Sequence, residues 1–217
     1  SDWFGKPRGT VKRSPSDGVF PLYASPDGSG VVVGDSIYQN GRRFAARQTG
    51  RGLAVWADDN RHMCGFGPVA NGSIAAPDSD ALQTWFVGKG PTTVVYLGSI
   101  GSRPGAEVVV CSVRTNRVLV IQRPPEAGTH EYWFAALSSG LIIHHEVLPG
   151  GPGGAYTDLV ASPDARYVAE MLLQPSPSGP VALSTAIHDA ESGVAVARLD
   201  AGKEVVRFSA DGESVLL

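Results

Sequence analysis

The sequence has few charged residues and no long hydrophobic run. Charged residues are 18% of the 217 residues, and the formal net charge is −3. Nucleic-acid binders carry a basic patch or stripe, and the densest basic stretch here holds only Arg42, Arg43, Arg47 and Arg51. We therefore expect no nucleic-acid partner. No run of 18 apolar residues is present, so we expect no insertion of this segment into a membrane.

Only two cysteines are present, Cys64 and Cys111. They do not form a CxxC pair, so a metal or redox motif of that kind is not expected. Both lie in apolar, strand-like runs, where free cysteines are commonly buried. The alternatives are two buried free thiols or one disulfide, and an extracytoplasmic location would favour the disulfide.

Catalytic motifs are also missing. The sequence has neither Gly-x-Ser-x-Gly nor a phosphate-binding loop. In His144-His145-Glu146, neighbouring residues of a strand point to opposite faces, so only His144 and Glu146 can share a face. We interpret this segment as an outer strand with solvated polar residues. The sequence predicts no catalytic residue, no metal site and no cofactor.

Asp58 and Asp59 form a second acidic candidate. A calcium site needs six to eight oxygen ligands, and the segment lacks the acidic periodicity of a calcium loop. We interpret Asp59 as a hairpin-turn residue that bonds its own backbone.

Glycine and proline are abundant, with 27 and 16 residues. Both residues break helices and mark turns, which excludes a helix bundle or a coiled coil. Short apolar runs rich in β-branched residues lie between the turns and predict strands. These runs are 30–34, 53–56, 92–97, 108–113, 118–121, 141–143, 194–197 and 215–217. Segment 162–173 also fits a helix capped by Ser162, but its residues recur in β surroundings, so we expect a turn and a strand.

Two turn patterns recur along the chain. An acidic turn between two apolar strands is present in 23–28, 56–61, 160–165 and 208–213. The wide interval between the second and third copies predicts that one copy has degenerated. A strand, a Ser-Gly turn and a strand follow one another in 134–143 and 187–196, and 110–119 reads as a third version with Asn in place of Gly.

A Ser-Pro-Asp-Gly hairpin followed by Asp-x-x-Ser-Gly-x-x-Val resembles the blades of β-propellers of the WD40-like and TolB-like repeat type. In such blades the first hairpin joins the inner strands and the second joins the outer ones. The resemblance implies an all-β fold, a β-propeller of about five irregular blades, with a β-sandwich as the alternative. Four strands and roughly 40 to 45 residues make one blade.

The resemblance also predicts the domain organisation. Residues 1–217 would form a single propeller domain, either whole or a piece of a larger chain, with an extended N-terminal segment at 1–17. We expect the last strands to complete a blade begun by the N-terminus, because an open ring would leave an apolar edge.

Aromatic residues provide the candidate binding site. Trp85 and the pair Tyr132 and Trp133 lie on strands that carry aromatics on both faces. One face of a sheet is normally core, so the other face would form an exposed platform. Together with His144 these are the candidate binding residues, and packing in the core is the competing interpretation.

The resemblance and the missing motifs favour a non-catalytic propeller that serves as a protein-interaction or sensor domain. It would be the exported part of a bacterial envelope or membrane-anchored protein, on the extracellular or periplasmic side, with a protein or a small ligand as partner. Four lysines against 14 arginines agree with a bacterial source. The alternative is a propeller-type enzyme such as a glycosidase or lyase, or the non-catalytic propeller of a peptidase. An enzyme would need converging acidic side chains, or a His with an acid, with raised pKa values.

Overall fold

The computed structural model describes residues 22–33, 36–39, 42–46, 54–68, 80–86, 90–95, 106–122, 130–148 and 154–217. These residues contain no α-helix, and no helix among them is long and apolar enough to cross a membrane. The strands of the first half are β1 (Leu22–Ala24), β2 (Gly30–Val33), β3 (Ser36–Gln39), β4 (Arg42–Ala46), β5 (Val55–Trp56), β6 (His62–Pro68), β7 (Asp80–Phe86) and β8 (Gly90–Val95). The remaining strands are β9 (Ala106–Ser112), β10 (Arg117–Gln122), β11 (His130–Ala136), β12 (Ile142–Leu148), β13 (Tyr156–Ala161), β14 (Tyr167–Gln174), β15 (Val181–Asp189), β16 (Ala195–Leu199), β17 (Arg207–Phe208) and β18 (Val215–Leu216).

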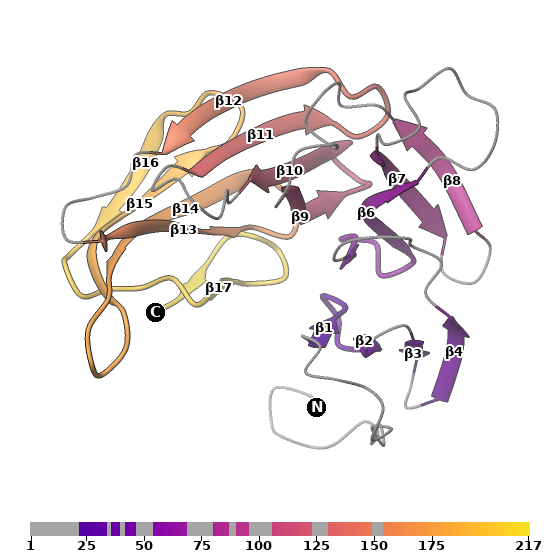
Figure 1. The fold of residues 1–217 in the computed structure, drawn as a ribbon, viewed down its shortest axis with the longest axis horizontal. Helices are drawn as coiled ribbons and strands as arrows, with labels where there is room; N and C mark the ends of the chain where they lie inside the picture. The colour runs from indigo at the N-terminus through magenta and orange to yellow at the C-terminus, as the bar shows by residue number, and fades with distance from the viewer. Residues whose placement is uncertain are drawn as a thin grey trace.

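The strands form five separate antiparallel sheets in chain order. Strands β1–β4, β5–β8, β9–β12 and β13–β16 each make a four-stranded meander, and β17–β18 make a two-stranded sheet. We name these sheets blades 1 to 5. The first strands of consecutive blades contact one another, β1 with β5, β5 with β9, β9 with β13 and β13 with β17. Figure 1 shows the blades following one another around an arc.

This arrangement is that of a β-propeller, in which the first strand of each blade lies innermost. The sandwich alternative would need the strands to share two facing sheets, whereas here they form five sheets. The expected fold class is therefore confirmed, with four complete blades and one of two strands.

The expected ring closure is not seen among the described residues. Strands β17 and β18 pair with each other, and β1–β4 form a separate sheet that already has four strands. The last strands therefore do not complete the first blade within the part of the chain that the structure describes. The predicted N-terminal segment, residues 1–17, lies outside the described residues.

The four acidic turns each join the first strand of a blade to the second. Their last turn residues have positive φ, at Gly28, Asn60, Ala165 and Gly212, a conformation that Gly and Asn tolerate best. In the turn before β14, the Ser162 hydroxyl donates to the Asp164 carboxylate over 2.6 Å. Segment 162–173 is thus a turn and a strand, as expected.

The degenerate copy is the β9–β10 turn of blade 3. Asn116 there has φ 57°, and the N–H of Thr115 donates to the Ser112 hydroxyl over 3.0 Å. Segment 110–119 therefore holds an inner hairpin, and its assignment to the Ser-Gly pattern was wrong. That pattern does join the third and fourth strands in blades 3 and 4, where Gly140 and Gly193 have positive φ.

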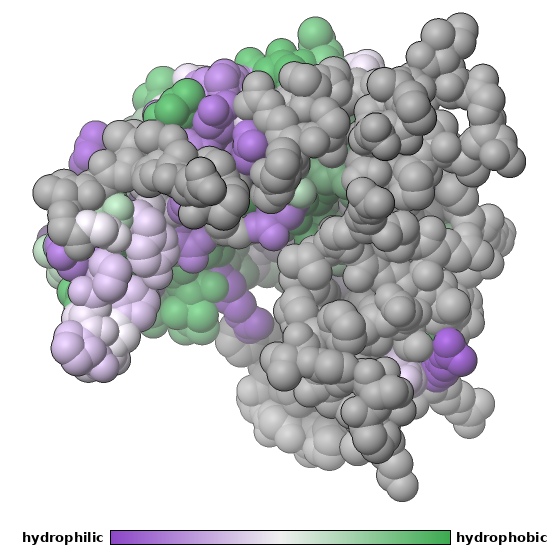
Figure 2. Space-filling model, viewed as in Figure 1, coloured by the Kyte–Doolittle hydropathy of each residue, from purple (hydrophilic) through white to green (hydrophobic). Residues whose placement is uncertain are grey.

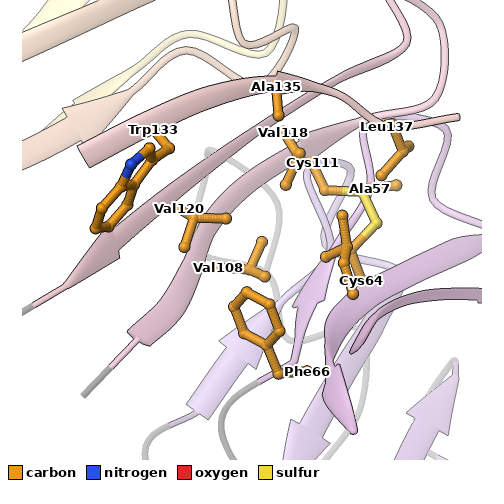
Figure 3. Close-up of a cluster of buried hydrophobic side chains, with 11 residues drawn as sticks. Ala57, Cys64, Phe66, Val108, Cys111, Val118, Val120, Trp133, Ala135 and Leu137 are labelled. Carbon is orange, nitrogen blue, oxygen red and sulfur yellow. A yellow bond between two sulfur atoms is a disulfide. The ribbon is translucent and has the colours of Figure 1, made fainter. Parts of the chain in front are cut away.

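Each central blade is buried on both faces because it packs between two neighbours. Along β10, Val118 and Val120 face the cluster shared with blade 2, while Leu119 and Ile121 face the cluster shared with blade 4. Figure 3 shows the first of these clusters, with side chains of blades 2 and 3 interleaved. This two-sided burial explains why the strands read as continuous apolar runs rather than as alternating ones.

Candidate functional site

The aromatic platform predicted from the sequence is not formed by Tyr132 and Trp133. Their exposed fractions are 1% and 5%, because blade 4 covers one face of β11 and blade 2 covers the other. Trp133 belongs to the core shared with blade 2 and stacks on His145, with ring centroids 5.1 Å apart. Trp85 lies in β7, and its side chain is outside the described residues. For Tyr132 and Trp133 the competing interpretation, packing in the core, is therefore the one that the structure shows.

Tyr132 instead belongs to a polar cluster between blades 3 and 4. Its hydroxyl oxygen lies 2.8 Å from Oε2 of Glu146 and 2.9 Å from Oε1 of Glu170. Glu146 is the cross-strand partner of Tyr132 on β12, whereas Glu170 comes from β14 of the next blade. One phenol therefore joins a carboxyl group of each blade.

Two histidines extend the polar cluster. Nε2 of His144 lies 3.3 Å from Oε2 of Glu146, and Nε2 of His188 lies 3.6 Å from Oε2 of Glu170. The expectation that His144 and Glu146 share a face is thus confirmed, and His145 points the other way, toward Trp133. The histidine rings are only partly exposed, so the segment is not a fully solvated outer strand.

Gly193, in the β15–β16 turn, lies next to both histidine rings. Its carbonyl oxygen lies 3.0 Å from Nδ1 of His188, and because a carbonyl only accepts, Nδ1 carries the proton. A Cβ at Gly193 would lie 2.7 Å from Cε1 of His144. The absence of a side chain there lets the His144 ring pack against the turn of the neighbouring blade.

The surroundings of the cluster favour its protonated forms. Burial raises the pKa of Tyr132, and the neighbouring carboxylates of Glu170 and Glu146 raise it further. Burial also raises the pKa of Glu170, while the facing His188 and the Tyr132 hydroxyl oppose that rise. A buried carboxyl group with a raised pKa is one feature of acid–base sites.

The geometry of the cluster limits its chemistry. The Tyr132 oxygen fills the space between the two carboxyl groups, where a substrate atom would have to lie for the pair to act on it. Among the described residues, no group of three or more His, Cys, Asp and Glu is placed to hold a metal ion. The cluster therefore joins blades 3 and 4 through the Tyr132 hydroxyl.

Glu170 and His188 were not among the residues singled out as binding candidates. The signal for Glu170 was present, since a lone carboxylate interrupts the apolar run Val168-Ala169-Glu170-Met171-Leu172. An ionisable residue in a strand that is buried on both faces needs a partner, and Tyr132 and His188 are the partners here.

Asp58 and Asp59 have separate roles. The Asp59 carboxylate accepts the backbone N–H groups of Arg61 and His62 at 3.0 and 2.9 Å, as expected for a hairpin turn. Partial burial alone would raise its pKa, but these bonds and the His62 ring lower it. Asp58 is buried and bonds blade 3, accepting the Ser112 hydroxyl at 2.7 Å and the Val113 N–H at 2.9 Å.

A disulfide joins the same two blades. The sulfur atoms of Cys64 on β6 and Cys111 on β9 are bonded, with the Cα atoms 6.2 Å apart. Both residues are fully buried. Cys111 also forms a bridge with Ala57, and its carbonyl accepts the N–H of Asp58 at 3.3 Å. Blades 2 and 3 are therefore linked covalently near the inner strands.

Exposed aliphatic side chains gather on the outer strands of blades 3 and 4. We call the following residues the outer rim: Leu141, Ile142, Ile143, Val147, Val194 and Val196. Their exposed fractions run from 37% at Ile143 to 69% at Leu141. The contact of His144 with Gly193 places β12 beside the β15–β16 turn, and Figure 2 shows hydrophobic surface above β12. The outer rim thus has residues on both blades, and Val147 lies on the face of β12 that carries His145.

Comparisons with known proteins assign no family. No family model and no curated protein matches the chain. Among solved structures, hydrazine synthase of Kuenenia stuttgartiensis matches at 17% identity and TM-score 0.41, covering 90% of this chain and 69% of that chain. A chain of the mitotic checkpoint complex matches at 15% identity and TM-score 0.42, covering 89% and 69%.

A further similar structure is prolyl oligopeptidase B of Galerina marginata, at 13% identity and TM-score 0.40. It is covered over only 37% of its length, against 87% of this chain. Likenesses this distant carry no argument about activity. The assignment as a propeller therefore rests on the order of the sheets and on the contacts between their first strands.

Proposed function

We propose that this protein is a non-catalytic β-propeller that binds another protein through the outer rim of blades 3 and 4. The exposed aliphatic side chains of that rim carry the proposal. Clustered exposed apolar side chains on an otherwise well-packed protein mark interaction sites.

The backbone of the outer strands supports a protein as the partner. Among the strands that the structure describes, β12 and β16 each pair on one side only, with β11 and β15. Within this part of the chain their outer edges therefore offer unpaired N–H and C=O groups beside the aliphatic side chains. An extended segment of a partner can pair with such an edge while its side chains pack on the rim.

The polar cluster supports the non-catalytic part of the proposal. An enzyme that used Glu146 and Glu170 would need both to face a substrate, but both face the Tyr132 hydroxyl. Glu146 also lies on the outermost strand of its blade, away from the innermost strands β9 and β13. A propeller enzyme that used this pair would first have to displace Tyr132.

The disulfide supports an oxidising compartment. Disulfides persist in extracellular and periplasmic proteins and are rare in the cytosol, and Cys64 and Cys111 are bonded here. We propose that the protein lies on the extracellular or periplasmic side of a bacterial membrane, as part of an envelope or membrane-anchored protein. The excess of arginine over lysine supports the bacterial source.

Photo-cross-linking in the producing cells tests the partner. A photoreactive residue would replace Val147 or Val196 on the outer rim, with Glu213, an exposed residue of blade 5, as the control position. We expect the same protein to be captured from both rim positions and not from Glu213. Capture from all three positions alike, or from none, would contradict a binding surface at the rim.

The captured protein would then be purified and its affinity measured by calorimetry. We expect Val147→Asp and Val196→Asp each to weaken binding by about tenfold or more, because a carboxylate in a desolvated apolar contact has no partner. Glu213→Gln should bind as the parent protein does. Unchanged affinity in both Asp variants would exclude the rim as the contact surface.

A further inference from the structure

One hydroxyl proton serves two carboxyl groups at the interface of blades 3 and 4. The Tyr132 O–H can donate to only one carboxylate at a time, yet its oxygen lies within 2.9 Å of both Glu146 and Glu170. Both contacts are hydrogen bonds only when one carboxyl group is itself protonated and donates to the phenol oxygen. A neutral phenol beside two ionised carboxylates holds one proton. The geometry in which both contacts are hydrogen bonds therefore requires a second proton.

Each of the two carboxyl groups is also faced by a histidine ring nitrogen. Nδ1 of His188 is the donor to the Gly193 carbonyl, so a second proton on this ring would lie on Nε2, facing Glu170. Nε2 of His144 likewise faces Glu146. Protonation of both rings places one positive charge beside each carboxyl group.

We propose that the interface of blades 3 and 4 is a proton-operated joint, closed in mild acid and loosened as the proton shared by Tyr132, Glu146 and Glu170 is lost. The inference does not rest on the proposed function. It follows from the contacts among Tyr132, His144, Glu146, Glu170 and His188.

Among the described residues, the charged and titratable groups around the joint lie on β10, β11, β12, β14 and β15 and in the β15–β16 turn. They are Arg117 on β10, His130 and Tyr132 on β11, His144 and Glu146 on β12, Glu170 on β14, His188 on β15, and Glu191 in the β15–β16 turn. Arg117 pairs with Glu191, and His130 bonds the Thr157 carbonyl at 2.7 Å. Because Arg117 and His130 have these other partners, the pH dependence of the joint depends on the four groups around Tyr132. These are His144, Glu146, Glu170 and His188.

The direction follows from the pKa of Glu170, which burial raises above its ordinary value. A group with a raised pKa in the folded state stabilises it fully below its ordinary pKa, and that stabilisation is lost as the pH rises through the raised value. Above the raised pKa of Glu170 the joint then holds two carboxylates and a single hydroxyl proton.

The inner part of the interface does not depend on these protons. Leu119, Ile121, Leu159 and Val168 form its apolar core, and the Thr115 hydroxyl donates to the Asp164 carbonyl at 2.7 Å. The loosening is therefore expected at β12 and at the β15–β16 turn, which are the outer part.

Hydrogen exchange tests the joint. Exchange would be measured by mass spectrometry on the intact chain from mildly acidic to mildly alkaline pH, above the ordinary carboxyl pKa, and corrected for intrinsic rates. We expect protection of β12 and of the β15–β16 turn to fall by about tenfold across this range, the factor of one pKa unit. Protection of β10 should stay constant. Constant protection at β12 as well would overturn the proposal.

The variants locate the response. Glu170→Gln removes the second negative charge and should abolish the pH dependence at β12, while Glu213→Gln on blade 5 should keep it. His188→Gln keeps a donor for the Gly193 carbonyl but removes the facing ring that lowers the pKa of Glu170, so loosening should begin at higher pH. If Glu170→Gln does not fold, His188→Gln decides alone. A pH dependence that neither variant changes would overturn the proposal.

Discussion

The carboxylate of Asp58 in blade 2 accepts a hydrogen bond of 2.7 Å from the Ser112 hydroxyl in blade 3. In blades 1, 4 and 5 the equivalent serine bonds an aspartate of its own turn, as Ser162 does with Asp164. Blade 3 has Arg114 at that position of the turn. The preceding blade thus supplies the carboxylate that the degenerate turn has lost, and the turn becomes a contact between blades.

Asp58→Ala should destabilise the protein by about 1–3 kcal/mol, because it leaves the Ser112 hydroxyl and the Val113 N–H without their acceptor. Urea unfolding at neutral pH measures the change. Asp200→Ala, at an exposed aspartate, serves as the control and should stay within about 0.5 kcal/mol of the parent.

Restoring the local acid should rescue the Asp58 variant. Arg114→Asp places a carboxylate two residues after Ser112, as in the Ser25 and Asp27 pair. In the Asp58→Ala background we expect it to recover about half of the lost stability, because the serine regains its acceptor while the link between the blades stays broken. A loss for Asp58→Ala no larger than that for Asp200→Ala would contradict this role of the turn.

Gly193→Ala should destabilise more than Gly202→Ala. Both glycines have positive φ, but a Cβ at Gly202 meets no atom within 4 Å, whereas one at Gly193 lies 2.7 Å from His144. The backbone conformation alone costs about 1–2 kcal/mol for a residue with a side chain. Thermal unfolding of both variants should show an added loss at Gly193 only.

His144→Ala identifies the source of that added loss. In this background Gly193→Ala should cost no more than Gly202→Ala does, because the ring that the new methyl group would meet is gone. An equal cost of Gly193→Ala with and without His144 would show that the two blades do not meet at this point.

The local pattern of the chain could be predicted from the sequence, and the contacts between blades could not. The acidic turns and the Ser-Gly turns predict hairpins, because the residues that form each turn are only a few positions apart. The strands on either side can then be predicted as well. The β9–β10 turn was assigned to the wrong class because the acid that completes it, Asp58, lies 54 positions away. Tyr132 was left open between a binding platform and the core because a single strand does not reveal that both of its faces meet a neighbouring blade.

Cys64 and Cys111 should carry no free thiol in the purified protein. Mass spectrometry after alkylation in denaturant should show no added group without reductant and two after reduction. Replacing both by alanine should cost about 4 kcal/mol in the loop-entropy account, for a sequence separation of 47. Alkylation of both residues without reduction would contradict the bond and remove the main support for an oxidising compartment.

Acid should weaken the β15–β16 turn through Asp189. The backbone N–H and the hydroxyl of Ser192 lower the pKa of this carboxyl group. A lowered pKa gives stabilisation that is present above the ordinary value and is lost as the pH falls through the lowered one. Asp189→Ala should therefore cost about 0.5 kcal/mol at neutral pH, since the group is exposed, and less near pH 3. A cost that grows in acid would contradict the assignment.

The packing of blade 3 against blade 4 through Tyr132 and Glu170 is tested most directly by a double-mutant cycle. Tyr132→Phe, Glu170→Gln and the double variant would be unfolded in urea at mildly acidic and at alkaline pH. The 2.9 Å contact predicts a coupling free energy of about 1 kcal/mol or more, because the Tyr132 hydroxyl and the Glu170 carboxyl group are hydrogen-bonded. A coupling near zero at both pH values would show that the two side chains do not meet.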